Sequence, residues 1–471
     1  MSRDSRATSP RPPMPSRSRV AVIGAGAAGL VAARELLREG HGPVVVVFER
    51  AAAVGGTWRY DDAASADPLG AGAVHGSLYA SLRTNLPREC MGFLDFPFLP
   101  VPGDPRRFPG HREVLRYLED FARRFDLLRL VRLETEVVGV RRRGASSWTV
   151  SYRSRKLAGA GCDGLEEEEV FDAVVVCNGH FTEPRLADIP GIDGWPGKQM
   201  HSHSYRVPDP FLGQVVVIIG YNPSGMDISR DIAGVAKEVH VAIRAAPAEI
   251  PSSTTTRANL WLHPMIERAE KDGSLVFEDG SRVKADAIVH CTGYKYSFPF
   301  LEEEEEGGAG GGGGGGAGVV VSVDDNRVGP LYKHVFPPRL APHISFVGLP
   351  FKAIPFPVFQ LQSSWVAGAL SGRIELPSPE EMMMDVVAFY SDMEAHGRPK
   401  RFTHDLGACT FEYEDWLAER CGREGIEEWR KAIHVKARAR VWHRPESYRD
   451  EHCDDDDDLL DQAHRDLAKY L

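Results

Sequence analysis

The 471-residue sequence predicts an α/β fold with two dinucleotide-binding, Rossmann-like domains, one of them inserted in the other. Two glycine-rich segments carry this prediction, VIGAGAAG at 22–29 and VIIGYNPSG at 217–225. Each segment follows a run of β-branched residues and precedes a stretch whose apolar residues have helical spacing. In such a strand–loop–helix unit, the glycines let the backbone approach a pyrophosphate at the helix N-terminus. One such loop binds one dinucleotide, so two loops in one chain indicate an enzyme that passes electrons between two dinucleotides, usually a flavin and a nicotinamide.

The first loop has the more complete pattern. Residues 19–23 are expected to form a buried strand, and the helix after the loop is expected to end near Gly40. Gly24 would allow the tight turn, Gly26 would admit the pyrophosphate, and Gly29 would let the helix pack against the strand. The alternative is a glycine turn in another kind of α/β domain.

An acidic residue closes the next expected strand. The strand at 44–48 ends in Glu49, at the spacing from the loop where a carboxylate binds the hydroxyls of an unphosphorylated ribose, as in FAD or NAD. The cofactor-binding residues expected in this unit are Gly24, Ala25, Gly26, Ala27, Ala28, Gly29, Glu49 and Arg50.

The second loop departs from the full pattern at its middle position. Gly220 follows the apolar strand, but Asn222 stands where a second glycine is usual, and Ser224 and Gly225 end the loop. The next strand ends in Arg244 rather than in an acid. A guanidinium binds phosphate in a bidentate manner, so Arg244 favours NADP over NAD. A solvated arginine on a surface turn is the alternative. Gly220, Asn222, Ser224, Gly225 and Arg244 are therefore expected to bind the second cofactor.

Composition and charge exclude several classes of function. The net charge of −11 comes mainly from acidic runs at 166–169, 302–306 and 454–458, which are expected to be solvated loops and a tail. No basic stripe indicates nucleic acid. Seven scattered cysteines without a CxxC pair exclude a two-nucleotide disulfide reductase and fit a reducing compartment, so we expect a cytoplasmic protein. No apolar run has the length of a membrane span, and no histidine cluster indicates a metal.

The order of motifs predicts the domain organisation. We expect a disordered leader at 1–18, with a short organelle-targeting segment as the alternative. An FAD-binding domain is expected at 19–207 and 330–471, and an NADPH-binding domain at 208–329, which includes a disordered Glu/Gly insertion at 302–318. The other expected elements are helices at 111–125 and 359–369, strands at 132–141, 148–152, 171–177, 239–243, 287–290 and 344–348, and a hairpin tip at 155–169.

Further motifs identify a family. The segment WPGKQMHSHSY at 195–205 matches the pattern F-x-G-x-x-x-H-x-x-x-Y/F of flavin-containing monooxygenases, with Trp195 in place of Phe. Baeyer–Villiger enzymes carry Trp where Tyr205 stands, so the pattern argues against that branch. GGTW at 55–58, TN at 84–85 and CTGY at 291–294 also resemble segments of this family. From about residue 20 to 450, the chain most resembles the plant S-oxygenating branch, which acts on sulfides such as methylthioalkyl glucosinolates.

The resemblance implies an FAD- and NADPH-dependent monooxygenase. In this family NADPH reduces FAD, and the reduced flavin adds dioxygen to form a 4a-hydroperoxyflavin, whose distal oxygen passes to a soft nucleophile, most readily a thioether sulfur. Asn85 is implied as the catalytic side chain, because its amide can donate a hydrogen bond to a peroxide oxygen while staying neutral. An asparagine in an ordinary turn is the alternative. The resemblance adds Gly56, Thr57, Trp58, Asn85 and Thr292 to the cofactor-binding residues.

Other functions are compatible with the same motifs. They are N-oxygenation of amines, a decarboxylating auxin-forming flavin monooxygenase, an uncoupled NADPH oxidase, and a non-catalytic flavoprotein that serves as an interaction module. The expected partners are a small sulfide or amine and dioxygen, without nucleic acid. The sequence leaves the oligomeric state and the physiological substrate open.

Overall fold

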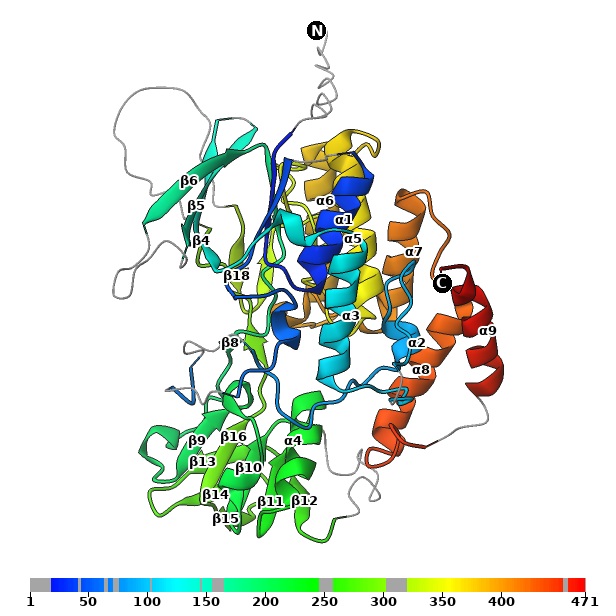
Figure 1. Cartoon of the computed structure of the whole chain (residues 1–471). Coiled ribbons are helices and arrows are strands. Elements are labelled where there is room, and N and C mark those ends of the chain that lie inside the picture. The colour runs from blue at the N-terminus through cyan, green and yellow to red at the C-terminus, as the bar shows by residue number, and fades with distance from the viewer. Residues whose placement is uncertain are drawn as a thin grey trace, which may run out of the picture.

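The computed structural model confirms the expected fold class, with two parallel sheets built from separate stretches of the chain (Figure 1). It describes residues 18–40, 44–62, 67–70, 76–101, 104–144, 146–154, 165–244, 257–301, 320–451 and 456–470. The expected leader, apart from Ser18, and the expected insertion at 302–318 lie outside these residues.

The first sheet has five parallel strands in the order β20-β7-β1-β2-β3. These are β20 (Ile344–Phe346), β7 (Ala173–Val176), β1 (Val20–Ile23), β2 (Val45–Phe48) and β3 (Val131–Arg132). Their sequences are rich in valine, whose branched side chain suits a pleated surface. The three central strands are almost wholly buried, as expected for a parallel sheet that is covered on both faces.

Helices cover one face of the first sheet (Figure 1). Helix α1 (Ala27–Arg38) packs along α5 (Pro355–Ser371), which starts earlier than the expected helix at 359–369. Helix α3 (His111–Arg124) agrees with its expected range and buries its apolar side in the same core. On the other face lies an antiparallel sheet of β4 (Thr135–Arg143), β5 (Ser147–Ser154) and β6 (Glu166–Phe171).

The acidic run at 166–169 was expected to be a solvated loop within a hairpin tip, and this expectation is wrong. These residues form most of β6 and pair with β5. The Glu169 carboxylate lies between the guanidinium groups of Arg19 and Arg132. Hydrogen bonding to neighbouring arginines compensates the local repulsion, so the run can stay extended on the sheet. The part of the expected tip at 155–164 lies outside the described residues.

The second sheet also has five parallel strands, in the order β12-β11-β10-β16-β9. These are β12 (Leu260–His263), β11 (Glu238–Ala242), β10 (Val215–Ile219), β16 (Ala287–His290) and β9 (Lys198–His201). Helix α4 (Pro223–Ala233) packs on β10 and β11. A smaller antiparallel sheet of β13 (Ile266–Ala269), β14 (Ser274–Phe277) and β15 (Arg282–Lys284) completes this part of the chain.

Two short strands mark where the chain passes between the sheets. β8 (Glu183–Pro184) leads toward the second sheet and pairs antiparallel with β17 (Tyr294–Lys295), which leads back. The hairpin β18 (Ser322–Asp324) and β19 (Arg327–Gly329) then precedes β20 in the first sheet. We therefore propose an inserted domain as expected, but with its start before β9, because β9 precedes the expected boundary at 208 and belongs to the second sheet.

The remaining helices lie beside the first sheet. They are α2 (Arg88–Met91), α6 (Pro379–Ala395), α7 (Thr410–Arg420), α8 (Glu428–His443) and α9 (Asp457–Leu467). Figure 1 shows α8 extending from α9 and α2 down to the level of α4. No helix among the described residues has both the length and the apolar character needed to cross a membrane.

The acidic run at 454–458 was expected to be a solvated tail; among its described residues Asp456 differs, whereas Asp457 and Asp458 are exposed at the start of α9. Asp456 is only 1% exposed, and its carboxylate accepts hydrogen bonds from Arg107 and Arg440 at 2.9 Å or less. Burial alone would raise the pKa of Asp456, but these arginines outweigh it and lower the pKa to about 2. The carboxylate thus stays charged and attaches the start of α9 to the body of the protein.

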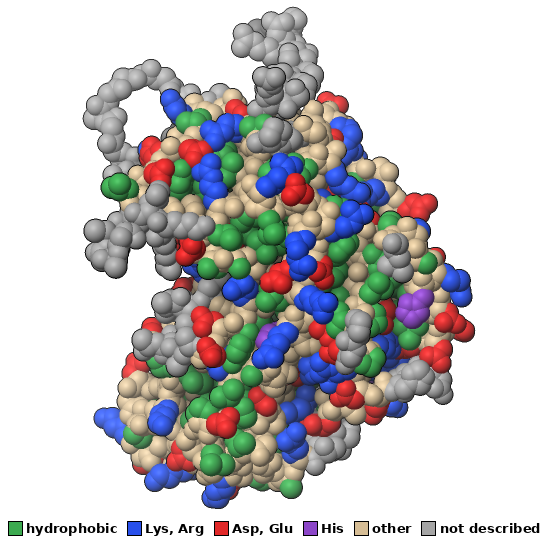
Figure 2. Space-filling view, viewed as in Figure 1, with side chains coloured by type: hydrophobic (Ala, Val, Ile, Leu, Met, Phe, Trp, Pro, Cys, Tyr) green, Lys and Arg blue, Asp and Glu red, His purple; other side chains and the backbone are tan. Residues whose placement is uncertain are grey.

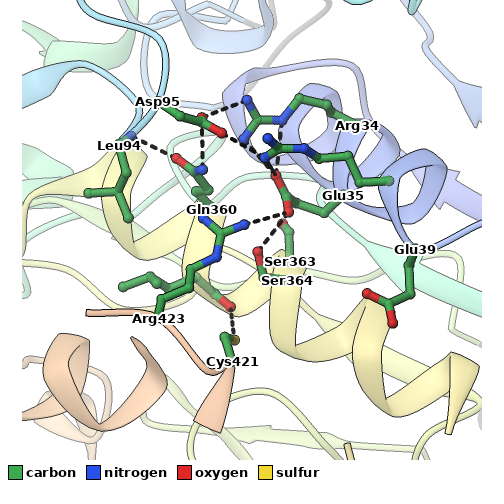
Figure 3. Close-up of polar contacts among 12 residues, drawn as sticks. Arg34, Glu35, Glu39, Leu94, Asp95, Gln360, Ser363, Ser364, Cys421 and Arg423 are labelled. Carbon is green, nitrogen blue, oxygen red and sulfur yellow. Dashed lines mark hydrogen bonds and ion pairs between the residues drawn. The ribbon is translucent and has the colours of Figure 1, made fainter. Parts of the chain in front are cut away.

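A buried polar network holds α1 against α5 (Figure 3). The Glu35 carboxylate accepts hydrogen bonds from Arg34, from the Ser364 hydroxyl at 2.8 Å and from Arg423 at 3.3 Å. Arg34 also donates to Asp95 at 2.7 Å, and Asp95 in turn accepts from Gln360 on α5. The network fixes the direction of α1, whose N-terminus faces the first loop.

Replacing Glu35 by alanine is expected to lower the free energy of unfolding by about 3 kcal/mol, because it removes one of the two carboxylates that pair with the buried Arg34 guanidinium. Denaturant unfolding of the purified protein would measure the change. The control is Glu39→Ala at the C-cap of the same helix, whose carboxylate pairs with the half-exposed Arg373 and should contribute less than ~1 kcal/mol. Equal effects of the two substitutions would contradict the role given to Glu35.

Candidate active site

The first loop has the steric constraints of a nucleotide-binding turn. Gly24 has a φ of 103°, and a Cβ there would lie 2.5 Å from the carbonyl oxygen of Cys177. A Cβ on Gly29 would lie 1.8 Å from the carbonyl oxygen of Gly24, so the helix and the loop touch at this position. A Cβ on Gly26 would have no such conflict, since the nearest protein atom, the Gly56 Cα, would be 3.5 Å away. Gly26 thus leaves open space at the start of α1, where a pyrophosphate belongs.

The GGTW segment packs directly on the first loop. The Gly55 amide donates to the Ala25 carbonyl oxygen at 2.9 Å, and a Cβ on Gly56 would lie 2.8 Å from the Gly26 Cα. Thr57 and Trp58 follow in a short 3-10 turn, with Trp58 half-buried against the core. The first loop and the GGTW segment, which β2 separates in sequence, therefore form one backbone surface.

Glu49 lies at the first loop, as expected. It is 4% exposed, and its two carboxylate oxygens accept hydrogen bonds from the amides of Ala25 and Ala51, each at 2.8 Å. This contact holds the loop against the end of β2. Arg50 lies farther out, with a guanidinium nitrogen 3.9 Å from the carboxylate of Glu136 at the surface.

The second loop repeats the geometry of the first. Gly220 has a φ of 100°, and a Cβ there would lie 2.6 Å from the carbonyl oxygen of Cys291. A Cβ on Gly225 would lie 2.0 Å from the carbonyl oxygen of Gly220. The Cys291 carbonyl thus limits the space at Gly220 as the Cys177 carbonyl does at Gly24, and each cysteine follows the corresponding parallel strand. The two strand–loop–helix units are structurally equivalent, and α1 and α4 occupy corresponding places in them.

The other residues expected at the second cofactor surround this loop. Asn222 is exposed at the N-cap of α4, and Ser224 is half-buried as the second residue of this helix. Among the described residues, no side chain caps the first amides of α1 or of α4, so both helix ends keep donors for an anion. Arg244 is exposed just beyond the carboxyl end of β11, on the edge of the sheet where ligands bind in such folds. The Thr292 hydroxyl instead donates to the Arg185 carbonyl oxygen in the crossing segment.

Asn85 lies on a turn whose residues contact α4 and the segment before α3. Its side chain is exposed, whereas the preceding Thr84 is buried and donates its hydroxyl to the Leu86 carbonyl oxygen at 2.8 Å. The Thr84 amide donates to the Pro109 carbonyl oxygen at 2.9 Å, which fixes the turn from the other side. Next to the turn, the Ser81 hydroxyl donates to Asp231 on α4 at 2.9 Å. The structure thus places Asn85 near the helix that follows the second loop.

The residues of the family pattern at 195–205 connect segments of the chain. His201 is 0% exposed, and its Nε2 lies 3.0 Å from the carbonyl oxygen of Gly293. Its Nδ1 accepts a hydrogen bond from the His203 amide at 3.0 Å. Burial lowers the pKa of His201 to about 4, so the ring is neutral near pH 7. The Tyr205 hydroxyl donates to Asp231 on α4 at 2.6 Å. These contacts give the pattern a structural role at the crossing between the sheets.

Three residues near the site carried no signal in the sequence. Asp227 on α4, Tyr79 before the Asn85 turn and Arg449 near the C-terminus meet in one hydrogen-bonded group. They come from distant parts of the chain and belong to no nucleotide-binding pattern, so no spacing rule would have selected them.

The surface around the site has mixed charge. On the face that Figure 2 shows, Lys and Arg side chains alternate with Asp and Glu over both parts of the described chain. Among the described residues, no three His, Cys, Asp or Glu side chains are arranged to hold a metal ion. Two turns closed to any Cβ, each followed by a helix with an uncapped N-terminus, fit two dinucleotides.

Comparison with known proteins agrees with this geometry. The model of the flavin-binding monooxygenase-like family matches residues 17–252 and 248–419. Flavin-containing monooxygenase FMO GS-OX-like 4 of Arabidopsis thaliana is 52% identical over 463 residues, which cover 96% of this chain and 97% of that protein. FMO GS-OX5 of the same plant is 53% identical over 469 residues, covering 97% and 96%. The solved structure of S-allyl-L-cysteine S-oxygenase from Allium sativum superposes with a TM-score of 0.88 at 54% identity, covering 96% of this chain and 99% of that one.

Proposed function

The chain belongs to the flavin-binding monooxygenase-like family, and from this membership we propose that it transfers one oxygen atom to the sulfur of a small thioether. It is a flavin-containing monooxygenase that uses FAD and NADPH. In the proposed reaction, dioxygen, NADPH and a proton convert the thioether to a sulfoxide, with water and NADP⁺ as the other products. The observation that carries the choice of sulfur is the 54% identity and TM-score of 0.88 to an S-oxygenase over nearly the whole chain.

FAD is proposed to bind at the first loop, and NADPH at the second. Bound FAD would supply the redox chemistry that activates dioxygen. The backbone of 24–29 and of Gly56 would face the FAD pyrophosphate, and Glu49 would accept hydrogen bonds from the ribose. Gly220, Gly225 and the amides at the start of α4 would hold the NADPH pyrophosphate. The chain's own contribution is to hold both cofactors at fixed places and to keep water from the reacting oxygen.

We propose that the protein works in the cytoplasm, as its cysteines suggest. The described cysteines Cys90, Cys177, Cys291, Cys409 and Cys421 are all free thiols, as is usual in a reducing compartment. The proposed partners are a small sulfide and dioxygen.

A panel of thioethers and tertiary amines tests the proposed reaction. Each compound would be incubated with the FAD-loaded protein and NADPH, and the mass gain of one oxygen atom would be scored against NADPH consumed. We expect close to one sulfoxide per NADPH for at least one thioether. N-oxides as the main products would assign the enzyme to amines. Hydrogen peroxide as the sole product across the panel would make it an NADPH oxidase.

Replacing Asn85 by aspartate is expected to leave FAD bound but to lower the oxygenated product per NADPH at least ~tenfold, with hydrogen peroxide rising in step. Aspartate keeps the shape of the side chain, but its carboxylate cannot donate a hydrogen bond to an oxygen atom and adds a negative charge. Peroxide and product would be quantified together. Asn259→Asp is the control, because the Asn259 amide donates to the carbonyl of Ala233, the last residue of α4, and to that of Ala236 just after it. Unchanged coupling in Asn85→Asp would move the oxygen site elsewhere.

Replacing Arg244 by alanine is expected to weaken NADPH binding about ten- to a hundredfold while leaving NADH binding unchanged, since a charge-assisted hydrogen bond to the 2′-phosphate would be lost. The ratio of kcat/KM for NADPH and NADH measures this preference. Lys237→Ala serves as the matched control, because Lys237 is the basic residue before the same strand and pairs with Glu238. If the preference stays the same in Arg244→Ala, another residue binds the 2′-phosphate.

A further inference from the structure

A turn near the C-terminus connects α4, the helix of the second nucleotide unit, with the turn that carries Asn85. After α8 ends at His443, residues 444–451 lie between α4 and the turn that carries Asn85, beside the lower end of α8 in Figure 1. Glu446 accepts a hydrogen bond from Arg230 on α4 at 2.9 Å. On the other side, Asp450 accepts two hydrogen bonds from Arg83, at 2.8 and 2.9 Å. The turn thus has ionic contacts both to α4 and to the Asn85 turn.

Arg449 joins α4 to the Asn85 turn through a single guanidinium. Two of its nitrogens bind the Asp227 carboxylate on α4, at 2.7 and 3.0 Å. Its Nε donates to the Thr84 carbonyl oxygen at 2.9 Å, and Nη2 also donates to the Arg83 carbonyl oxygen at 3.2 Å. The side chains of Arg449 and Asp227 are 16% and 14% exposed, so water screens this pair less than a surface pair. We call Arg449, Asp227 and the two carbonyls the latch.

Both ends of the latch lie next to residues of the proposed active site. Thr84 directly precedes Asn85, and Asp227 lies two residues beyond Gly225 in the first turns of α4. The Tyr79 hydroxyl donates to the same Asp227 carboxylate at 3.0 Å, which adds a second link from the Asn85 segment. A shift of α4 relative to the Asn85 turn would therefore break a bidentate ion pair or at least one carbonyl contact.

We propose that Arg449 is a positioning residue, which sets Asn85 at a fixed place relative to the second nucleotide loop through Asp227. This proposal rests on the proposed function, because it assigns Asn85 to the oxygen site. The latch acts through the Asn85 turn and does not touch substrate. When it is intact, the nicotinamide nucleotide and the Asn85 amide are held together, so that oxygen is transferred before it is lost as peroxide.

The test uses Arg449→Gln, Asp227→Asn and the double variant in the full-length, FAD-loaded protein. Asp227→Asn keeps the shape of the side chain and an acceptor for Tyr79 but removes the charge. We expect faster hydrogen–deuterium exchange at residues 79–86 in both single variants, and a several-fold larger share of NADPH electrons released as hydrogen peroxide. The double variant should be no worse than either single one, because both changes break the same interaction.

Arg430→Lys is the matched control. The Arg430 guanidinium also joins a carboxylate, that of Glu427, to carbonyl oxygens of Glu89 and Cys90, at 2.8 to 3.1 Å, but all these residues lie beside the first sheet. This variant should lower the Tm without changing the peroxide share or the exchange at 79–86. The latch proposal is overturned if Arg449→Gln keeps wild-type exchange and peroxide share, or if Arg430→Lys changes both as strongly.

Failure of the latch and failure of the proposed reaction give different results. Hydrogen exchange and the affinity for NADP⁺, measured by titration, need no thioether. If the wild-type protein oxygenates no thioether while Arg449→Gln still loosens residues 79–86, the choice of substrate is wrong and the latch stands. If thioethers are oxygenated with the same yield in Arg449→Gln and wild type, the latch is wrong and the reaction stands.

Discussion

A purified Gly29→Ala protein is expected to be colourless and to retain at least ~tenfold less FAD than the wild type. The added Cβ would lie 1.8 Å from the carbonyl oxygen of Gly24, far inside van der Waals contact. Neither atom can move alone. The Cβ of residue 29 belongs to the first turn of α1, and the Gly24 carbonyl belongs to a loop that packs against the Cys177 backbone. The helix start must move away from the loop, and the amides that would face the pyrophosphate move with it. The ratio of absorbance at 450 nm to that at 280 nm, taken after desalting, measures the bound flavin.

Two control variants locate the cause of this loss. Gly26→Ala meets no protein atom closer than 3.5 Å, so it should fold as the wild type does. If Gly26 leaves space for the pyrophosphate, this variant still binds FAD weakly, and added FAD should restore part of the colour. Gly194→Ala, whose new Cβ would have only side-chain atoms of Lys271 at 3.9 Å, should keep full FAD content. A yellow, stable Gly29→Ala protein would show that the first loop does not hold the flavin.

The corresponding change in the second unit, Gly225→Ala, is expected to separate flavin binding from flavin reduction. Its Cβ would lie 2.0 Å from the carbonyl oxygen of Gly220, which displaces the start of α4. The first unit is untouched, so the protein should remain yellow and should still be bleached by dithionite. Reduction by NADPH should slow at least ~tenfold at a fixed NADPH concentration, because the pyrophosphate loses its backbone donors. Anaerobic stopped-flow absorbance measures the reduction rate directly.

The pair of loop variants also tests the assignment of cofactors to loops. If the assignment is correct, Gly29→Ala loses colour, whereas Gly225→Ala loses only the response to NADPH. The reverse pattern would exchange the two sites. Loss of colour in both variants would instead mean that the second unit is needed to hold the flavin.

The local patterns of the sequence predicted the architecture well. The two glycine loops, the valine-rich strands and the helix expected at 111–125 follow from contiguous residues, and the structure confirms each of them. The two acidic runs show where this approach fails. A run of carboxylates predicts a solvated segment only when no cation faces it, and the partners of Glu169 and Asp456 include Arg19 and Arg107, 150 and 349 residues away. The sequence contains those arginines but not their distance from the acids.

By itself, the sequence determined the two nucleotide units and the family, because a tight turn that excludes any Cβ needs glycine at fixed spacing within a few residues. Only the tertiary structure decided what lies around these units. It brought Glu35 into contact with Ser364 and Arg423, and it placed Arg449 against Asp227, 222 residues earlier in the chain, and beside the Asn85 turn. The reason is physical: steric rules for a turn act between neighbours in the chain, whereas a hydrogen bond between distant side chains exists only after the sheets and helices have packed.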